Sequence, residues 1–184
     1  KRMNTQVENV LRMAQHEKGE LQLDMEEINI HDIIQKALEL ILIQVESKQG
    51  KLTSELNATR PVIHGDPMHL SNVIFNLLDN ANKYSPLEPL ISISTEDTDG
   101  GIVISVKDQG MGMSKETQKK IFEKFYRVSK GNIHNIKGFG LGLSYVKAII
   151  EALGGRISVK SEVNKGSRFD IFIPKKQKEN GKSI

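Results

Sequence analysis

The sequence predicts an α/β two-layer sandwich, in which a mixed, largely antiparallel sheet of about five strands packs under three main helices. Apolar residues recur at helical spacing in three long segments, which begin near residues 30, 66 and 141. Several shorter segments alternate apolar and polar residues, as half-buried strands do. The chain has 184 residues, of which 38% are apolar and 27% charged, so it can bury the core of one ordinary domain.

The first 24 residues are expected to precede this domain. The apolar positions of residues 1–16 are spaced by 4, 3 and 4, which is a heptad seam typical of a helix packed against a partner: Met3, Val7, Val10 and Ala14. The sequence Glu-Lys-Gly-Glu at residues 17–20 then breaks this helix.

The next elements are a helix at residues 30–47 and two short strands at residues 51–56 and 61–64. Asp66-Pro67 predicts the start of the second main helix, because an aspartate can cap free N–H groups and a proline suits the first helical position. Its apolar residues keep helical spacing: Leu70, Val73, Ile74, Leu77, Leu78 and Ala81. Two prolines mark the loop that follows.

The second half of the chain begins with a predicted hairpin. Residues 90–95 and 102–107 alternate in polarity, and Asp99-Gly100-Gly101 between them predicts the turn. The remaining elements are expected in this order: a short helix at 114–122, a mobile loop at 123–140, the third main helix at 141–153, and a final strand pair at 156–161 and 167–174.

Composition and charge exclude several classes of function. The chain has no cysteine, which excludes disulfides and thiolate metal sites, and no apolar run approaches the roughly 20 residues that a membrane span needs. The net charge of +3 is too small to imply nucleic acid, and no nucleic-acid partner is expected. Residues 115–137, however, carry seven basic and two acidic groups, which favours an anionic ligand such as phosphate. The basic tail at residues 175–184 is expected to be a flexible, solvated segment.

Two glycine clusters are candidates for binding that anion: Asp108-Gln-Gly110-Met-Gly112 and Gly138-Phe-Gly140-Leu-Gly142-Leu143. The second cluster runs directly into a predicted helix. A glycine-rich turn at a helix N-terminus presents free backbone N–H groups and the positive end of the helix dipole to a phosphate. Taken alone, the pattern also fits a purely structural glycine loop.

A polar stripe on the second main helix is a candidate metal site. Asn76, Asn80 and Lys83 fall along one side of the helix, beside the apolar stripe. A carboxamide oxygen is a hard, neutral ligand that suits Mg²⁺, which usually keeps several waters and shares phosphate oxygens. Taken alone, such a stripe is more often only a solvated helix face.

Together these segments resemble the motifs of sensor histidine kinases. In chain order they resemble the N box (Asn76–Ser85), the G1 box (Asp108 to Gly112), the F box (Ile121–Arg127), the G2 box (Gly138 to Leu143) and the terminal glycine motif (Lys165 to Phe169). The resemblance covers residues 25–174 and implies the catalytic and ATP-binding domain of the GHKL superfamily, with a Bergerat-type ATP-binding fold. Residues 1–24 resemble the end of the dimerisation and phosphotransfer helix with its linker.

The resemblance implies ATP and Mg²⁺ as cofactors. It implies that Asn80 coordinates Mg²⁺, that Asn76 lies beside the phosphates or the metal, and that Lys83 meets the phosphates. It also implies that Tyr84 lines the pocket and that Asp108 accepts a hydrogen bond from the exocyclic amino group of adenine, since a carboxylate has no donor of its own.

The resemblance further implies that Arg127 reaches the γ-phosphate and that residues 123–140 form an ATP lid. Gly110 and Gly112 would let the backbone approach the nucleotide. The phosphates would be wrapped by backbone N–H groups of the G2 box: Gly138, Gly140, Leu141, Gly142 and Leu143. Phosphoryl transfer needs these groups because it depends mostly on positioning and on charge neutralisation.

Two departures refine this interpretation. None of the five histidines stands in an H box, so the phosphoacceptor histidine is expected on a dimerisation domain outside this chain. GHKL enzymes that hydrolyse ATP place a glutamate general base one helical turn before the metal asparagine, where this chain has Asn76. An amide cannot take the proton, which favours transfer to a nucleophile activated elsewhere over hydrolysis.

The predicted function is the ATP-binding catalytic domain of a two-component sensor histidine kinase, which transfers the γ-phosphoryl group of ATP to a histidine. A GHKL-type ATPase or serine kinase and a nucleotide-sensing binding module are the alternatives. The expected partners are the phosphoacceptor dimerisation domain of the same protein and a response regulator receiver domain, and the full-length protein is expected to be a homodimer. The expected location is the cytoplasmic side of a membrane-bound sensor.

Overall fold

The computed structural model describes residues 22–85, 87–127 and 139–175. The heptad segment expected at residues 1–16 and the central part of the expected lid lie outside the described residues, as does nearly all of the expected basic tail. Within the described ranges, no helix is both long and apolar enough to cross a membrane.

The described elements follow the predicted order. The helices are α2 (Ile30–Glu46), α3 (Pro67–Lys83), α4 (Lys115–Lys120) and α5 (Gly142–Ala152). The strands are β1 (Glu26–Asn29), β2 (Lys51–Leu56), β3 (Val62–Gly65), β4 (Leu90–Thr98), β5 (Gly101–Asp108), β6 (Arg156–Glu162) and β7 (Gly166–Pro174). Except for β1, which the sequence pattern does not predict, each element lies within a few residues of its predicted bounds.

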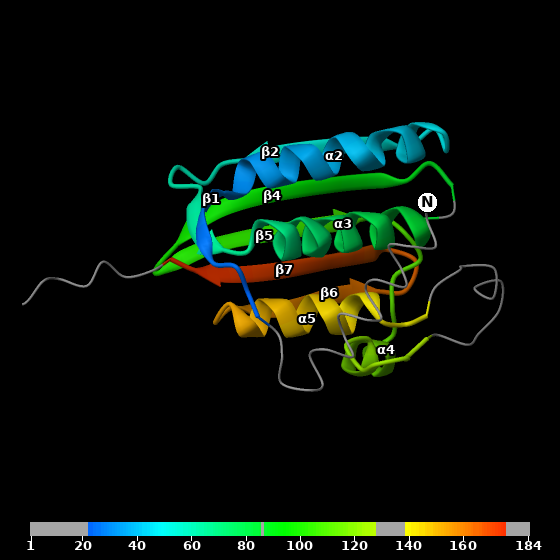
Figure 1. Cartoon of the computed structure of the whole chain (residues 1–184). Helices are drawn as coiled ribbons and strands as arrows, with labels where there is room; N and C mark the ends of the chain where they lie inside the picture. Colours follow the sequence, from blue (N-terminus) through cyan, green and yellow to red (C-terminus); the bar gives the residue numbers. More distant parts are fainter. Residues whose placement is uncertain (1–21, 86, 128–138, 176–184) are drawn as a thin grey trace, which may run out of the picture.

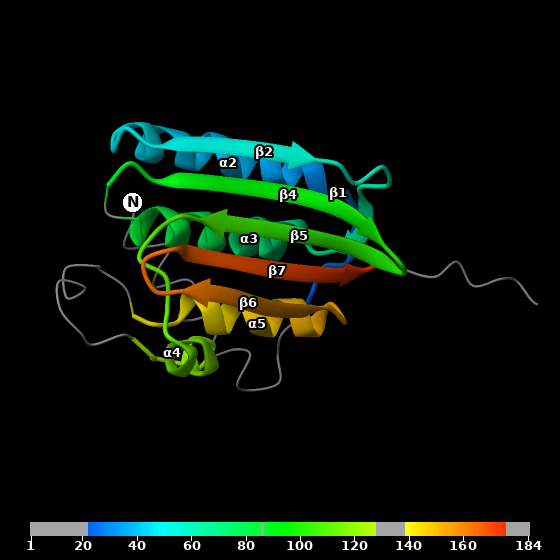
Figure 2. The same cartoon turned by 180° about the vertical axis from the view of Figure 1, so that it is seen from behind.

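A five-stranded sheet in the order β2-β4-β5-β7-β6 forms one layer of the domain (Figure 2). Strand β2 pairs with β4 in parallel, and the other neighbouring strands are antiparallel. The three long helices α2, α3 and α5 lie side by side over one face of this sheet (Figure 1). The prediction of an α/β two-layer sandwich is therefore confirmed.

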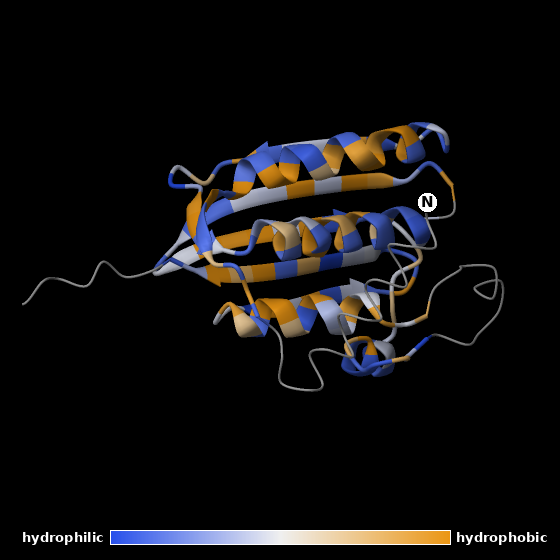
Figure 3. Ribbon diagram, viewed as in Figure 1, coloured by the Kyte–Doolittle hydropathy of each residue, from blue (hydrophilic) through white to orange (hydrophobic). Residues whose placement is uncertain are grey.

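The core lies between the helices and the sheet. Apolar positions recur along both the helices and the strands (Figure 3). Ile34 and Leu78 from the helices and Ile104 and Ile171 from the sheet are completely buried. Burying a side chain of this size contributes roughly 1.5–3 kcal/mol, so the apolar stripe determines which way each helix faces. The polar stripe of α3 is thereby turned to one side of the core.

Helix α3 begins where the sequence predicts. The Oδ1 atom of Asp66 accepts a hydrogen bond from the N–H of His69 at 2.9 Å, and Pro67 is the first helical residue. The Oδ2 atom of Asp66 accepts from the N–H of Asp24 at 3.0 Å, which ties the incoming chain to this helix. The helix ends at Lys83, so the candidate metal and phosphate residues Asn76, Asn80 and Lys83 all lie in its C-terminal half.

Strand β1 pairs antiparallel with β3 in a separate two-stranded sheet, in which Ile28 stands opposite Ile63. Ile28 is the buried residue of this short strand, so the strand has no alternation that a sequence pattern could reveal. The parallel pairing of β2 with β4 is likewise absent from the prediction, because pairing partners are set by contacts between residues far apart in sequence.

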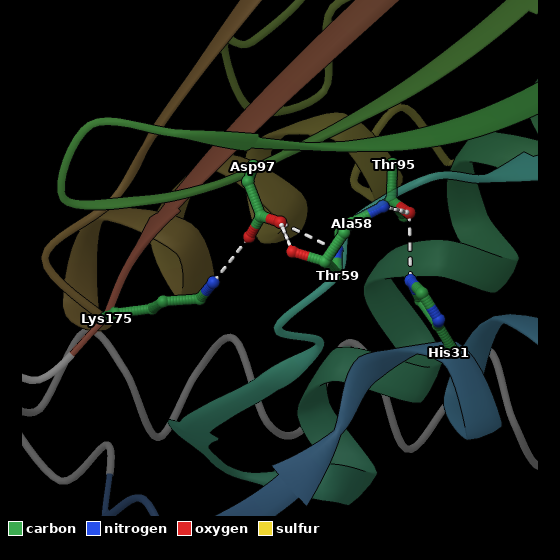
Figure 4. Close-up of polar contacts among 6 residues, drawn as sticks. All are labelled: His31, Ala58, Thr59, Thr95, Asp97 and Lys175. Carbon is green, nitrogen blue, oxygen red and sulfur yellow. Dashed lines mark hydrogen bonds and ion pairs between the residues drawn. The ribbon is translucent and has the colours of Figure 1, made fainter.

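The β4–β5 hairpin turns at Asp99-Gly100, as predicted, with Gly100 at a φ of 78°. Near this turn a polar cluster joins three segments of the chain (Figure 4). Asp97 accepts hydrogen bonds from the Nζ of Lys175 at 2.6 Å, from the N–H of Thr59 at 2.6 Å and from the Oγ1 of Thr59 at 2.7 Å. These hydrogen bonds, led by the one from Lys175, hold the pKa of Asp97 well below its usual range.

Candidate functional site

A cavity of about 480 Å³ lies at the end of the sheet opposite the Asp97 cluster. It is bounded by the C-terminal half of α3, the loop after β5, the first turn of α5 and the β6–β7 turn. The lining residues are Asn80, Ala81, Tyr84, Asp108, Met111, Gly112, Met113, Ser114, Thr117, Ile121, Tyr126, Arg127, Leu143, Val163, Asn164, Ser167 and Phe169. Residues from all five resembling motifs therefore meet at one cavity.

Asp108 is the buried carboxylate of this cavity, at the last position of β5. Its Oδ1 atom accepts hydrogen bonds from the N–H of Gly110 at 2.8 Å and of Ser167 at 3.3 Å. Burial raises the pKa of Asp108, and the two backbone N–H groups oppose this shift. Among the described residues Oδ2 has no hydrogen-bond donor, so the carboxylate presents an acceptor to a ligand.

The glycine loop after β5 packs against its neighbours too closely for side chains. A Cβ atom on Gly112 would stand 1.8 Å from the carbonyl oxygen of Glu162, and Gly112 has a φ of 62°. A Cβ atom on Gly110 would stand 2.4 Å from the carbonyl oxygen of Tyr84. That same oxygen accepts a hydrogen bond from the N–H of Met111 at 3.0 Å, so the loop is fixed to the turn after α3.

The polar stripe of α3 is divided by the structure. Asn80 lines the cavity, whereas Asn76 is half-buried beside it. The Nδ2 group of Asn76 donates to the carbonyl oxygen of Asn72 at 2.8 Å. Its Oδ1 atom stands 2.9 Å from where a Cβ atom on Gly142 would lie, so the glycine lets the start of α5 approach this amide closely.

Lys83, the last residue of the stripe, and Tyr84, which follows it, differ in environment. Lys83 forms an ion pair with Asp79 one turn earlier on α3 and is not among the lining residues. Tyr84 lines the cavity; burial raises the pKa of its phenol, and the positive charge of Arg127 opposes this shift. The cavity therefore brings Tyr84 and Arg127 together, and contact of Lys83 with a phosphate stays a prediction.

Both ends of the expected lid lie at the cavity. The N–H of Phe125 donates to the carbonyl oxygen of Gly140 at 3.0 Å, which joins the two ends. Gly140 has a φ of 72°, and a Cβ atom there would stand 2.8 Å from the backbone of Phe125 and of Tyr126. Arg127 and Leu143 line the cavity, Leu141 is buried before α5, and Gly138 lies outside the described residues.

Much of the cavity wall is apolar, and the sequence motifs do not predict these contacts. The side chains that form this wall include Met111, Met113, Ile121, Val163 and Phe169. The ring of Phe122 packs edge-on against that of Phe169, at 6.5 Å between centroids, and supports the wall from behind. Met111 and Met113 alternate with Gly110 and Gly112, and this proximity to the first glycine cluster is the sequence feature that indicates contact with a ligand.

The residues present fit a nucleotide better than an independent metal ion. The cavity volume falls within the roughly 300–1,000 Å³ typical of small-molecule sites. In the part of the chain that the structure describes, no group of three or more His, Cys, Asp or Glu is placed to hold a metal. A Mg²⁺ ion would take the amide oxygen of Asn80 and complete its shell with phosphate oxygens and water, which is its usual mode of binding.

The fold and the cavity thus define a nucleotide-binding domain of the α/β class. A family model described as "Histidine kinase-, DNA gyrase B-, and HSP90-like ATPase" matches residues 65–177. The chain belongs to this family.

Individual relatives agree with the family match. The sensor protein RprX of Bacteroides fragilis is 47% identical over 176 residues, which cover 95% of this chain and 34% of RprX. The catalytic domain of the histidine kinase ThkA matches with a TM-score of 0.73 at 27% identity, over 83% of this chain and 98% of that one. Full-length ShkA in complex with AMPPNP has a TM-score of 0.80 at 23% identity, over 94% of this chain and 36% of that one, and shows the fold alone. The chain therefore spans about a third of the length of RprX.

Proposed function

We propose that this chain is the ATP-binding catalytic domain of a two-component sensor histidine kinase, and that it transfers the γ-phosphoryl group of ATP to a histidine on a dimerisation domain. One observation carries the proposal: the buried carboxylate of Asp108 and the amide of Asn80 line the same cavity as Arg127. This set offers an acceptor for a base, a ligand for a metal and a cation for phosphate. The family match and the named sensor kinases among the relatives support it.

Adenine is assigned to the Asp108 end of the cavity. The carboxylate accepts a hydrogen bond from the exocyclic amino group, and the apolar wall packs against the faces of the ring. Guanine presents a carbonyl oxygen at the corresponding edge, which would face the carboxylate acceptor to acceptor. Because Asp108 is buried, this mismatch costs more than it would in water.

The phosphates are assigned to the region between α3 and α5. Asn80 holds Mg²⁺, which when bound neutralises phosphate charge and orients the triphosphate for transfer. Arg127 contacts the γ-phosphate, and Lys83 turns from Asp79 toward the phosphates. The backbone N–H groups at Gly140, Leu141, Gly142 and Leu143 wrap the phosphates at the start of α5, where the helix dipole is positive.

Transfer to a histidine is favoured over hydrolysis because of Asn76. Its amide nitrogen already donates to the carbonyl oxygen of Asn72, and its oxygen faces Gly142. An amide in this position cannot take a proton from an attacking water. The nucleophile is then the imidazole of the acceptor, which needs no base on this helix.

The partners of the proposed kinase follow from this reaction. The acceptor histidine lies on a dimerisation domain of the same protein, and the phosphoryl group passes on to the receiver domain of a response regulator. We also propose that the full-length protein is a homodimer and that this domain works on the cytoplasmic side of a membrane-bound sensor.

Isothermal titration with ATP tests the nucleotide-binding part of the proposal. The chain is expected to bind ATP more tightly with Mg²⁺ than with EDTA, and Asn80→Ala should remove most of that difference. Asn57→Ala, an exposed asparagine in the loop after β2, is the matched control and should behave as the wild type. Failure of the wild-type chain to bind ATP under both conditions would rule out the proposed function.

A further inference from the structure

Lys48 is a half-buried lysine that lies outside the five motifs. It lies in the turn between α2 and β2, and its Nζ donates to the carbonyl oxygens of Asn82 at 2.6 Å and Ser85 at 3.3 Å. Both acceptors belong to the C-terminal end of α3 and the turn that follows. A cation there satisfies carbonyl groups that the helix leaves open and interacts favourably with the negative end of its dipole.

Lys48 forms these two hydrogen bonds although partial burial disfavours its charged form. Desolvation lowers the pKa of its ammonium group, and the nearby carboxylate of Asp79 partly restores it. Neighbouring backbone closes the same junction: the N–H of Lys51 donates to the carbonyl oxygen of Pro89 at 2.7 Å, and a Cβ atom on Gly50 would stand 2.5 Å from that oxygen. The turn after α2 is therefore packed directly on the segment that follows α3.

The segment that Lys48 holds is also the support of the base end of the cavity. Tyr84 lies between the two anchored carbonyls, and its own carbonyl accepts from the N–H of Met111. The Cβ position on Gly110 stands 2.7 Å from the Oγ of Ser85 and 2.9 Å from the Oδ1 of Asp108. The anchored turn therefore packs directly against the loop that fixes this carboxylate.

We propose that Lys48 is a positioning residue of the nucleotide site, which holds the Tyr84–Ser85 turn against the glycine loop and so sets the preference of the site for adenine over guanine. The inference rests on the proposed nucleotide binding and adds to it a residue outside the motifs. Lys48 does not line the cavity, so its effect passes through Tyr84, Met111 and the orientation of Asp108. A lysine that merely stabilised the fold would weaken the binding of all nucleotides alike.

The test compares Lys48→Met and Lys48→Arg with Lys36→Met, which removes an exposed lysine of α2. Dissociation constants for ATP and for GTP are measured by titration at one pH, and thermal melting is recorded for each variant. Lys48→Met should weaken ATP binding about tenfold and GTP binding much less, so that the ATP-to-GTP preference narrows about tenfold. Lys48→Arg should keep most of the preference, and Lys36→Met all of it.

Two results would overturn the inference. One is an unchanged ATP-to-GTP preference in Lys48→Met, and the other is a parallel loss for both nucleotides that follows the loss of thermal stability. If Lys48→Met proves too unstable to study, Lys48→Gln carries the test, because it also removes the charged group that reaches both carbonyls and should narrow the ATP-to-GTP preference in the same way. Absence of ATP binding by the wild-type chain would instead defeat the proposed function itself, and this inference with it.

Discussion

The N–H of Gly110 donates to the Oδ1 atom of Asp108 at 2.8 Å, within the loop that begins the cavity wall. The N–H of Ser167 on β7 reaches the same oxygen at 3.3 Å. The loop after β5 and strand β7 thus hold one carboxylate oxygen through their backbone, and the other oxygen is left for a ligand. The different roles of the two carboxylate oxygens are the structural basis of the proposed adenine recognition, and we call this arrangement the division of the carboxylate.

Asp108→Asn tests that division. The side-chain oxygen of the asparagine should keep the two backbone hydrogen bonds, which turns its NH₂ group toward the base and sets donor against donor with adenine. ATP affinity is expected to fall about ten- to a hundredfold, and GTP, which offers an acceptor at that edge, should lose much less. Titration with both nucleotides measures this, with Asp99→Asn in the hairpin turn as the control. Equal losses for ATP and GTP would contradict the assignment.

Arg127→Ala separates binding from transfer. Arg127 lines the cavity, and its charge opposes the rise that burial causes in the pKa of Tyr84, so this charge can also act on a bound phosphate. Its loss should reduce the rate of phosphoryl transfer by about 10³-fold while ATP affinity changes by less than about threefold. Single-turnover rates and equilibrium titration measure the two quantities. The control is Lys119→Ala on the exposed side of α4, and similar losses in rate and affinity would argue against the role of Arg127.

Gly140→Ala tests whether the joined ends of the expected lid matter for transfer. Gly140 and Gly100 both have positive φ angles, but a Cβ atom on Gly100 meets nothing within 4 Å, whereas one on Gly140 meets the backbone of Phe125 and Tyr126. Gly100→Ala should therefore cost only about 1 kcal/mol of stability. Gly140→Ala should in addition lower the transfer rate by on the order of tenfold to a hundredfold, measured at saturating ATP. Equal transfer rates in the two variants would show that this contact is purely structural.

Asp97→Asn, at the end of the sheet far from the cavity, is expected to change the pH dependence of stability. The pKa of Asp97 is lower in the folded chain than in the unfolded one, so its ionised form stabilises the fold. The advantage of the wild type over Asp97→Asn should be complete above about pH 5 and should shrink as the pH falls below about 4. Tm values of both proteins across this range measure it. A difference in Tm that is constant down to pH 2.5 would contradict the prediction.

The sequence predicts those parts of the fold that depend on neighbouring residues. The start of α3 follows from Asp66-Pro67, and the β4–β5 turn from Asp99-Gly100, because caps and turns are chemistry within a few positions. The sequence also predicts that Asn80, Asp108 and Arg127 belong to one site. The structure places all three at the same cavity, although they are distant in sequence. It was the resemblance to a known family, rather than periodicity, that linked those three.

Most of the remaining features depend on contacts between segments that are distant in sequence. The pairing of β1 with β3 and the hydrogen bonds of Lys48 join segments that are separated in the chain by other elements. The ion pair of Lys83 with Asp79 is an exception, because the two residues are one helical turn apart and their spacing predicts such a pair. The resemblance assigns Lys83 only to the phosphates. The sequence does not predict the apolar wall, because Met111, Met113 and Phe169 have the composition of ordinary core residues.

The most direct test of the proposed transfer combines this chain with Mg²⁺, γ-labelled ATP and a separately supplied helical hairpin that carries an H-box histidine. Label on the hairpin and released phosphate are scored together. Transfer to histidine predicts hairpin label that is stable to base and labile to acid, with little free phosphate. Rapid release of phosphate without label on the hairpin would contradict it and would identify a hydrolase in spite of Asn76.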